Sequence, residues 1–255
     1  MRTQDTGLPK TAVILGGAST VAQALAHAYA QAGYALVLAD IDFDEVTRIA
    51  ADVAIRHGVR CIPHYLDATA YQTHEPFAIT CAEDLGGTPG GVMLTLGYMP
   101  EQAHAQADFT LAQRAFDTNV TGSVSLLERF AAHFEQRGGG FVVGLSSVAG
   151  DRGRKANYIY GASKAAMSCY LSGLRNRLHG AGVQVLTVKP GFMDTKMTYG
   201  MDLPGPLTAA PEAAARAIFR AQAKGKDVVY VSFPWRYIMM IIRSIPERQF
   251  KKMDI

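Results

Sequence analysis

Three side chains in the second half of the chain have the residue types and the spacing of a proton-transfer site. Tyr160 and Lys164 stand four positions apart in the run YGASK, so a helix would place both on one face. An ammonium group beside a phenol lowers the phenol's pKa from about 10, and such a phenol can exchange a proton with an alcohol or ketone oxygen. Ser147, at the end of a predicted strand, can hold the same oxygen. Because YxxxK pairs are common on helix surfaces, this interpretation depends on the other motifs.

A turn of small residues, GGASTVA, lies between a predicted strand and a predicted helix near the start of the chain. Small residues allow backbone N–H groups to approach a pyrophosphate, and the first turn of a helix offers further unpaired N–H groups. An ordinary strand-to-helix turn would fit too, since the run is not a full GxGxxG motif. The cofactor-binding residues predicted here are Gly16, Gly17, Ala18, Ser19, Thr20 and Val21.

Two acidic residues follow the next two predicted strands. Asp40 can accept both hydroxyl groups of an adenosine ribose and would repel a 2′-phosphate, and no Arg or Lys occurs in residues 41–46. We therefore expect NAD as cofactor, with NADH preferred over NADPH. Asp67 follows the third strand, where its carboxylate could bind the adenine amino group or cap a helix. The sequence leaves these two alternatives open.

Short apolar runs alternate with longer segments of helical period, which predicts an α/β fold with a Rossmann-type, doubly wound parallel sheet. Strands are expected at residues 11–15, 35–39, 59–66, 91–96, 141–145, 183–188 and 227–231. Helices are expected at residues 20–33, 43–57, 71–85, 108–136, 158–180 and 211–223. We predict a single NAD(P)-binding domain over residues 1–255, with its core at about 10–232 and an apolar and basic helical segment at 233–255.

These motifs together resemble the short-chain dehydrogenase/reductase family of the single-domain type, over residues 10–232. The resemblance implies that Ser147, Tyr160 and Lys164 carry catalysis. It also implies a role for Asn119, in the run NVTG, in a water-linked proton relay to Lys164. No metal is expected at this site, and three scattered cysteines without His partners indicate neither a metal site nor a disulfide framework.

The resemblance further implies which residues meet the nicotinamide half of the cofactor. The family's Pro-Gly motif matches Pro190 and Gly191, followed by the backbone of Met193 and the side chain of Thr195. Gly97 matches the last position of the family's Asn-Ala-Gly motif, where this chain reads TLG. The glycine loop departs from the family pattern TGxxxGxG, because Leu15, Thr20 and Ala22 replace the Thr and the second and third Gly.

The C-terminal runs WRYIMMIIRSIP and FKK, with AKGK before them and the GG loop, resemble one branch of the family. Its members are the decaprenylphosphoryl-2-keto-ribose reductases. This resemblance implies an NADH-dependent reduction of a 2-keto sugar carried on a polyprenyl-phosphate lipid, and a homodimer or homotetramer. A reductase or dehydrogenase of a soluble ketone or acyl substrate is one alternative. A non-catalytic dinucleotide-binding sensor is an alternative of another class.

The net charge of +3 is unevenly distributed. From Lys224 onward seven basic residues stand against three acidic ones, so the rest of the chain is close to neutral. A nucleic-acid partner is therefore not expected. In the tail, aromatic residues beside cations are typical of peripheral membrane contact, whereas a lid helix over the substrate cleft would need the same apolar residues. Both interpretations stay open.

The first ten residues are polar and lack the apolar core of a signal peptide. No apolar run approaches the roughly 20 residues that a membrane-spanning helix needs. We expect a cytoplasmic protein, in contact with the inner membrane surface at most.

Overall fold

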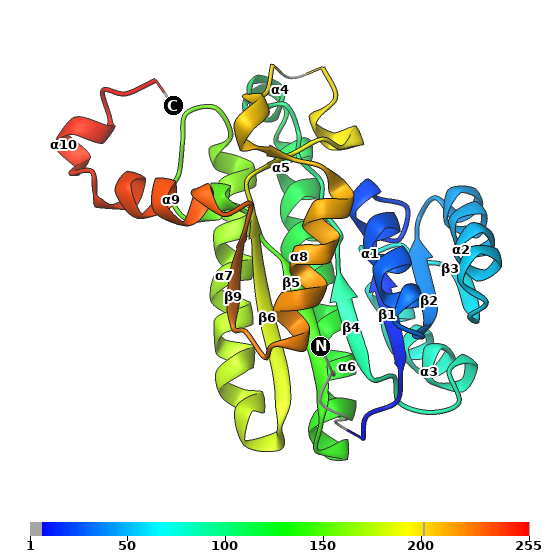
Figure 1. Ribbon diagram of the computed structural model, residues 1–255. Coiled ribbons are helices and arrows are strands. Elements are labelled where there is room, and N and C mark those ends of the chain that lie inside the picture. The colour runs from blue at the N-terminus through cyan, green and yellow to red at the C-terminus, as the bar shows by residue number, and fades with distance from the viewer. Residues whose placement is uncertain (1–6, 201, 255) are drawn as a thin grey trace.

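Seven parallel strands form the central sheet of the structure, a computed structural model that describes residues 7–200 and 202–254. The predicted polar start at residues 1–6, together with residues 201 and 255, lies outside the described residues. The strand order is β3-β2-β1-β4-β5-β6-β9 (Figure 1). The strands are β1 (Thr11–Leu15), β2 (Ala35–Asp40), β3 (Cys61–Tyr65), β4 (Gly91–Leu94), β5 (Gly140–Leu145), β6 (Val183–Pro190) and β9 (Val228–Val231). This arrangement confirms the predicted fold class.

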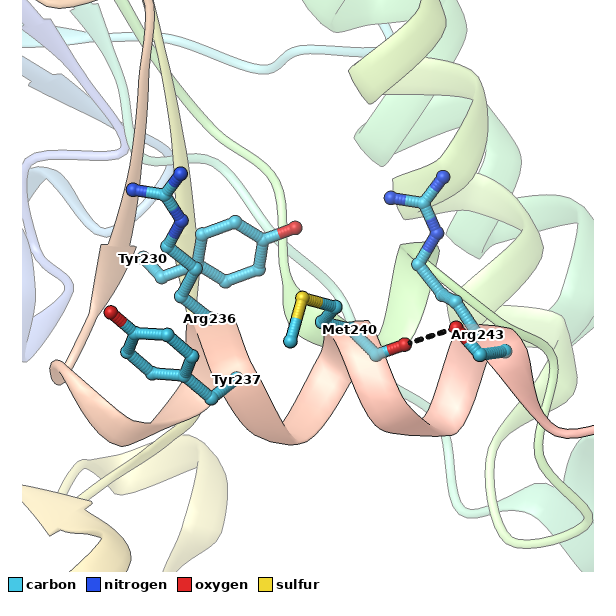
Figure 2. A pocket seen from close by; sticks show the side chains of 6 residues that line it. Tyr230, Arg236, Tyr237, Met240 and Arg243 are labelled. Carbon is cyan, nitrogen blue, oxygen red and sulfur yellow. Dashed lines mark hydrogen bonds between the residues drawn. The ribbon is translucent and has the colours of Figure 1, made fainter.

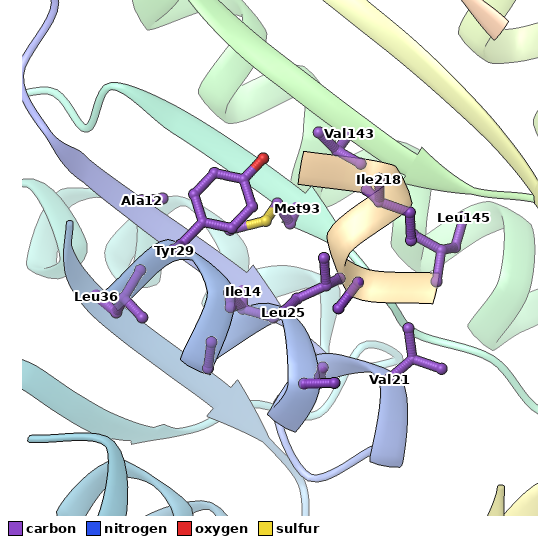
Figure 3. Close-up of a cluster of buried hydrophobic side chains, with 14 of the residues drawn as sticks. Ala12, Ile14, Val21, Leu25, Tyr29, Leu36, Met93, Val143, Leu145 and Ile218 are labelled. Atoms are coloured by element: carbon purple, nitrogen blue, oxygen red, sulfur yellow. The ribbon is translucent and has the colours of Figure 1, made fainter. Parts of the chain in front are cut away.

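Helices cover both faces of the sheet, so alternate residues of each strand enter two separate cores. Ala12 and Ile14 of β1 point to the side of α1 (Thr20–Gln31), α2 (Phe43–His57) and α8 (Pro211–Ala223) (Figure 3). Val13 and Leu15 point to the side of α3 (His74–Asp84), α6 (Ser123–Arg137) and α7 (Tyr158–Leu178). This burial on both faces explains why the strands read as nearly continuous apolar runs.

The predicted helix at 108–136 is confirmed, and it contains a π-helical turn that the sequence did not predict. The segment expected as a single helix at 108–136 consists of α5 (Phe109–Phe116), a π-helical turn η2 (Asp117–Gly122) and α6, and a short helix, α4 (Gln102–Ala107), precedes it. Gly122 ends the π-helical turn so close to the neighbouring backbone that a Cβ there would lie 1.9 Å from the Ala68 carbonyl oxygen. This contact is tertiary, so hydrophobic periodicity gave no sign of it.

The C-terminal segment is helical, as predicted, and is divided into α9 (Pro234–Ser244) and α10 (Glu247–Phe250). Figure 1 shows both helices projecting beyond the β9 edge of the sheet. Between β6 and α8 the chain also forms a two-stranded ladder of β7 (Phe192–Met193) and β8 (Thr208–Ala209), which is too short for a sequence pattern to reveal. None of the helices in the described part of the chain is long and apolar enough to cross a bilayer.

Candidate active site

The predicted site residues gather at one edge of the sheet, because all seven strands end there. The strand order reverses between β1 and β4, and open α/β sheets bind their ligands in the crevice outside the carboxyl ends of the strands at such a point. The glycine loop follows β1 on one side of this crevice, and the TLG run follows β4 on the other. Ser147 follows β5, and Pro190 ends β6.

Ser147, Tyr160 and Lys164 are brought together as the spacing predicted. Ser147 begins the 3-10 turn η3 (Val148–Gly150), where its Oγ accepts a hydrogen bond from the N–H of Ala149 at 3.1 Å. Its hydroxyl also lies beside the phenol of Tyr160. Lys164, one turn further along α7, is 3% exposed, and its Nζ lies 5.7 Å from the centre of the Tyr160 ring.

The expected effect of Lys164 on the Tyr160 pKa is wrong for the structure as it stands. Burial raises the pKa of Tyr160 to about 12, and only the Ser147 hydroxyl acts to lower it. The ammonium of Lys164 instead donates to the carbonyl oxygens of Leu145 at 3.1 Å and Leu96 at 3.4 Å. Burial also lowers the pKa of Lys164 to about 8, because the charged form is desolvated.

Two glycines that the sequence interpretation missed allow η3 to pack directly on α7. A Cβ on Gly150 would lie 2.6 Å from the Lys164 carbonyl carbon, and one on Gly161 would lie 2.8 Å from the Ala149 oxygen. Ser146, also missed, donates its hydroxyl to the Lys164 carbonyl oxygen at 2.7 Å. These contacts set the distance between the loop that carries Ser147 and the helix that carries Tyr160.

Asn119 is 1% exposed and lies in the π-helical turn η2. Its Oδ1 accepts from the N–H of Tyr98 at 2.7 Å, while Nδ2 donates to the Tyr98 carbonyl at 2.8 Å and to Ser163 Oγ at 2.9 Å. The side-chain amide therefore joins the loop after β4 to α7. Its predicted part in a water-linked relay to Lys164 stays a prediction.

The glycine loop is held in place by its neighbours. Gly16 has φ +89°, and a Cβ there would lie 2.7 Å from the Leu96 nitrogen, so this position requires glycine. A Cβ on Gly17 would lie 2.9 Å from a methyl carbon of Val46 in α2, so this position is also tightly packed. Ser19 caps α1 by accepting from the N–H of Ala22 at 3.2 Å. In the described structure the N–H groups of Thr20 and Val21 have no hydrogen-bond partner.

Asp40 lies beside this loop, as its place at the end of β2 predicted. Its Oδ2 accepts from the N–H of Ala18 at 3.0 Å, and its Oδ1 accepts from the N–H of Asp42 at 3.1 Å. Asp67 is not a helix cap. Its Oδ1 accepts from the N–H and the hydroxyl of Thr69, which lowers the pKa of Asp67, so it stabilises a local turn. Its contact with adenine stays a prediction.

The run after β4 closes the other side of the crevice. Thr95, at the position where the family has Asn, donates its hydroxyl to the carbonyl oxygens of Leu15 at 2.8 Å and Gly16 at 2.9 Å. Gly97 lies next to the lysine, since a Cβ there would be 3.6 Å from Lys164 Nζ. Thr95, which replaces the family's Asn, therefore fastens the glycine loop to the end of β4.

The segment after β6 carries Pro190, Gly191, Met193 and Thr195 to the same edge. Gly191 donates its N–H to the Val231 carbonyl at 2.6 Å, and Met193 belongs to the β7–β8 ladder. Thr195 caps the 3-10 turn η5 (Lys196–Thr198) through Thr198. The N–H of Lys196 donates to Thr20 Oγ1 at 3.4 Å, so this segment reaches across to the glycine loop.

The side chain of Arg152, in the loop after Ser147, connects the C-terminal helices to the site. Arg152 donates to the carbonyl oxygens of Ile242 at 2.7 Å and Ile245 at 2.6 Å, and pairs with Glu247 at 2.9 Å. Its guanidinium therefore caps the carboxyl end of α9. Asp151, whose side chain is 2% exposed, pairs with Lys189.

A parallel sheet with a small-residue turn after its first strand and a Ser-Tyr-Lys set at its carboxyl edge defines an α/β oxidoreductase of the dinucleotide-binding class. The family model for short chain dehydrogenases matches residues 10–202. The chain belongs to the short-chain dehydrogenase/reductase family and is an NAD(P)-dependent oxidoreductase.

Full-length relatives agree with this assignment. The chain is 36% identical over 249 residues to an uncharacterized oxidoreductase of Mycobacterium tuberculosis, covering 98% of each chain. It is 32% identical over 251 residues to an uncharacterized oxidoreductase of Streptomyces coelicolor, again covering 98% of each.

Solved structures share the fold. A short-chain dehydrogenase/reductase from Mycobacterium ulcerans superposes with a TM-score of 0.81 at 18% identity, covering 99% of this chain and 100% of that one. A short-chain dehydrogenase from Sphingobium yanoikuyae, solved in complex with NADPH, gives a TM-score of 0.81 at 24% identity, covering 95% and 98%.

Proposed function

We propose that this protein is an NADH-dependent reductase that converts a ketone to a secondary alcohol, and that its substrate is the 2-keto sugar of a polyprenyl-phosphate lipid. The observation that carries the ketone chemistry is the placement of the Ser147 hydroxyl beside the Tyr160 phenol, with Lys164 one turn away on α7. A donor pair of this kind serves a carbonyl oxygen that becomes negatively charged during reduction.

The residues at the crevice fit a dinucleotide. The unpaired N–H groups of Thr20 and Val21 at the start of α1 suit a pyrophosphate, and the positive φ of Gly16 lets the loop pass directly against the residues after β4. Gly17, Ala18 and Ser19 complete this loop. On the nicotinamide side, Gly97, Pro190, Gly191, Met193 and Thr195 would hold the carboxamide and its ribose.

When bound, the nicotinamide supplies the hydride that the carbonyl carbon receives. Tyr160 donates its proton to the carbonyl oxygen, and Ser147 holds that oxygen by a hydrogen bond. The pKa of Tyr160, raised to about 12, keeps the phenol protonated at neutral pH, as a proton donor must be. Lys164, with a pKa of about 8, is charged at neutral pH and stabilises the tyrosinate that remains. Asn119 fixes the loop after β4 on α7.

The preference for NADH rests on Asp40. Each of its carboxylate oxygens accepts one backbone hydrogen bond, and each can accept another from a ribose hydroxyl. A 2′-phosphate at the same place would meet this negative charge. The Sphingobium yanoikuyae neighbour was solved with NADPH, but it is only 24% identical to this chain. We therefore base the cofactor preference of this chain on Asp40.

The lipid-linked substrate is supported by the position of the C-terminal segment. Trp235 and Met239 of α9 pack against Val148, the residue after Ser147, and Phe192 of the β7–β8 ladder lies against the Trp235 ring. Other apolar side chains of α9 are exposed to solvent. An apolar helix seated next to the reacting residues provides a surface for a substrate whose carrier is a hydrocarbon chain.

An assay of NADH oxidation tests this function. We expect kcat/KM for a polyprenyl-phosphoryl 2-keto-pentose to exceed that for the same 2-keto-pentose phosphate without its lipid by about a hundredfold, because remote binding energy contributes to turnover. Equal values would remove the lipid from the proposal. An enzyme that binds NADH but reduces neither substrate nor a panel of small ketones would overturn the reductase assignment.

A further inference from the structure

One side of α9 is buried in the protein, and the rest of the helix is open to solvent. Trp235 and Met239 are 3% and 0% exposed, whereas Phe233, Met240 and Ile241 are 75%, 59% and 63% exposed. No acidic residue occurs between Pro234 and Ser244. The helix thus presents apolar and cationic side chains outward, although Arg152 and the Trp235 contacts fix it firmly to the site.

A cavity of about 580 Å³ lies between α9 and β9 on this exposed side. Figure 2 shows Arg236 and Arg243 extending from the same side of α9, with Met240 between them and the ring of Tyr230 nearby. The two arginines are seven positions apart, which is two helical turns and about 10 Å along the axis. Tyr237 and Ser244 complete the lining.

The positive charge of this cavity is not neutralised by the protein. Neither Arg236 nor Arg243 forms an ion pair with a carboxylate of the described residues. The neighbouring acid, Asp151, is paired with Lys189 and accepts the Tyr230 hydroxyl at 2.7 Å. Tyr230 lies beside Arg243 in the lining of the cavity. The buried carboxylate of Asp151 is thus engaged by Lys189 and Tyr230, which leaves the charge of Arg243 available.

We propose that this cavity binds the phosphate group of an anionic membrane lipid, with the exposed apolar side chains of α9 entering the interface beside it. Guanidinium groups match the geometry of phosphate oxygens, and two in one cavity can share a phosphate. Aromatic and aliphatic side chains next to cations are the composition of a surface that lies in a lipid interface. Lipid is favoured over a protein partner because the exposed residues on both sides of the arginines are apolar. This site does not depend on the identity of the carbonyl substrate.

Co-sedimentation with vesicles tests the site on the full-length protein. We expect binding to phosphatidylglycerol/phosphatidylcholine vesicles and little binding to phosphatidylcholine alone. The double variant Arg236→Gln/Arg243→Gln should bind the anionic vesicles about tenfold more weakly or worse. The matched control is Lys251→Gln/Lys252→Gln, which removes the same charge from exposed positions that follow α10. The control should bind nearly as well as wild type. Emission of the single tryptophan, Trp235, reports whether α9 stays seated in each variant.

Other outcomes would overturn the site. An equal loss in both double variants would indicate general attraction to the tail instead of a phosphate site. Binding of glycerol phosphate in a calorimeter without vesicle binding would assign a soluble ligand. If sedimentation equilibrium shows a dimer that the arginine variant alone dissociates, the cavity is an interface with a second copy of the chain. Turnover of a soluble ketone should be the same in all three proteins, so failure of the lipid site is separable from failure of the proposed chemistry.

Discussion

The indole of Trp235 rests on the backbone of Gly191, so closely that a Cβ on Gly191 would lie 1.9 Å from the indole Nε1. The same Nε1 donates to the Leu207 carbonyl oxygen at 3.1 Å. The C-terminal helix is thereby fixed to the Pro-Gly turn after β6 and to the loop before α8. Two segments far apart in the sequence share one contact beside the proposed nicotinamide site.

Gly191→Ala should disturb this contact, because the added methyl group overlaps the ring. We expect a loss of about 1–3 kcal/mol in the free energy of unfolding and a red shift of the Trp235 emission as α9 moves. Urea denaturation followed by fluorescence measures both. Gly205→Ala is the control, since a Cβ there meets no atom within 4 Å. Matching stability and emission in the two variants would contradict the packing argument.

Tyr160→Phe should abolish turnover while NADH still binds. The phenol is the only proposed proton donor to the carbonyl oxygen, and loss of general acid catalysis slows a reaction by about a thousandfold. Stopped-flow NADH oxidation and fluorescence titration separate the two effects. Tyr158→Phe removes an exposed hydroxyl that accepts from Gln106 at 2.8 Å, and it should keep wild-type rates. An undiminished rate in Tyr160→Phe would sink the mechanism.

Burial of Lys164 should make stability depend on pH. Its pKa is about 8 in the folded protein and 10.5 when solvated, so between these values the unfolded chain binds more protons and the unfolding free energy rises with pH. Below pH 8 Lys164 is charged in both the folded and the unfolded chain, so the whole free-energy cost of burying the charge is present. Compared with Lys164→Met, the wild type should gain about 2 kcal/mol from pH 7.5 to 9.5 in urea titrations. The comparison cancels other titrating groups, and parallel profiles would contradict it.

Asp40→Asn should change the choice of cofactor. The amide can still accept the Ala18 N–H, but it removes the charge that opposes a 2′-phosphate. We expect the ratio of the Kd for NADPH to the Kd for NADH to fall by about tenfold, which corresponds to about 1.4 kcal/mol. Asp42→Asn, a loss of the same charge at the cap of α2, should leave this ratio nearly unchanged. Tighter binding of NADPH than NADH by the wild-type protein would refute the proposed preference.

Local patterns in the chain were enough to predict the sheet and the grouping of Ser147, Tyr160 and Lys164. Parallel strands buried on both faces must be apolar along their whole length, and helices packed on them must repeat with a period near 3.6, so element types were readable. Tyr160 and Lys164 meet because four positions along a helix are neighbours whatever surrounds them. The π-helical turn at Asp117–Gly122 was not predicted, and the close approach of Gly122 to Ala68 is a tertiary contact that no local pattern indicates.

The charge interactions of the site were predicted less well from the sequence than its fold. Proximity of Lys164 suggested a lowered Tyr160 pKa, but the folded environment desolvates both groups and gives the ammonium two carbonyl partners. Arg152 and Asp151, for which the sequence indicated no partner, are bonded to α9 and to Lys189 of β6. Such outcomes depend on burial and on partners from distant segments, which no local spacing encodes.

By itself, then, the sequence determined the doubly wound sheet, the small-residue turn after β1, the grouping of Ser147, Tyr160 and Lys164, and the concentration of positive charge in the tail. Each of these depends on residue type and short-range period. Only the tertiary structure decided that Thr95 fastens the glycine loop, that Gly191 and Trp235 join the tail to the site, and that two arginines of α9 share one cavity. These relationships are set by which surfaces meet when segments far apart in the chain pack together.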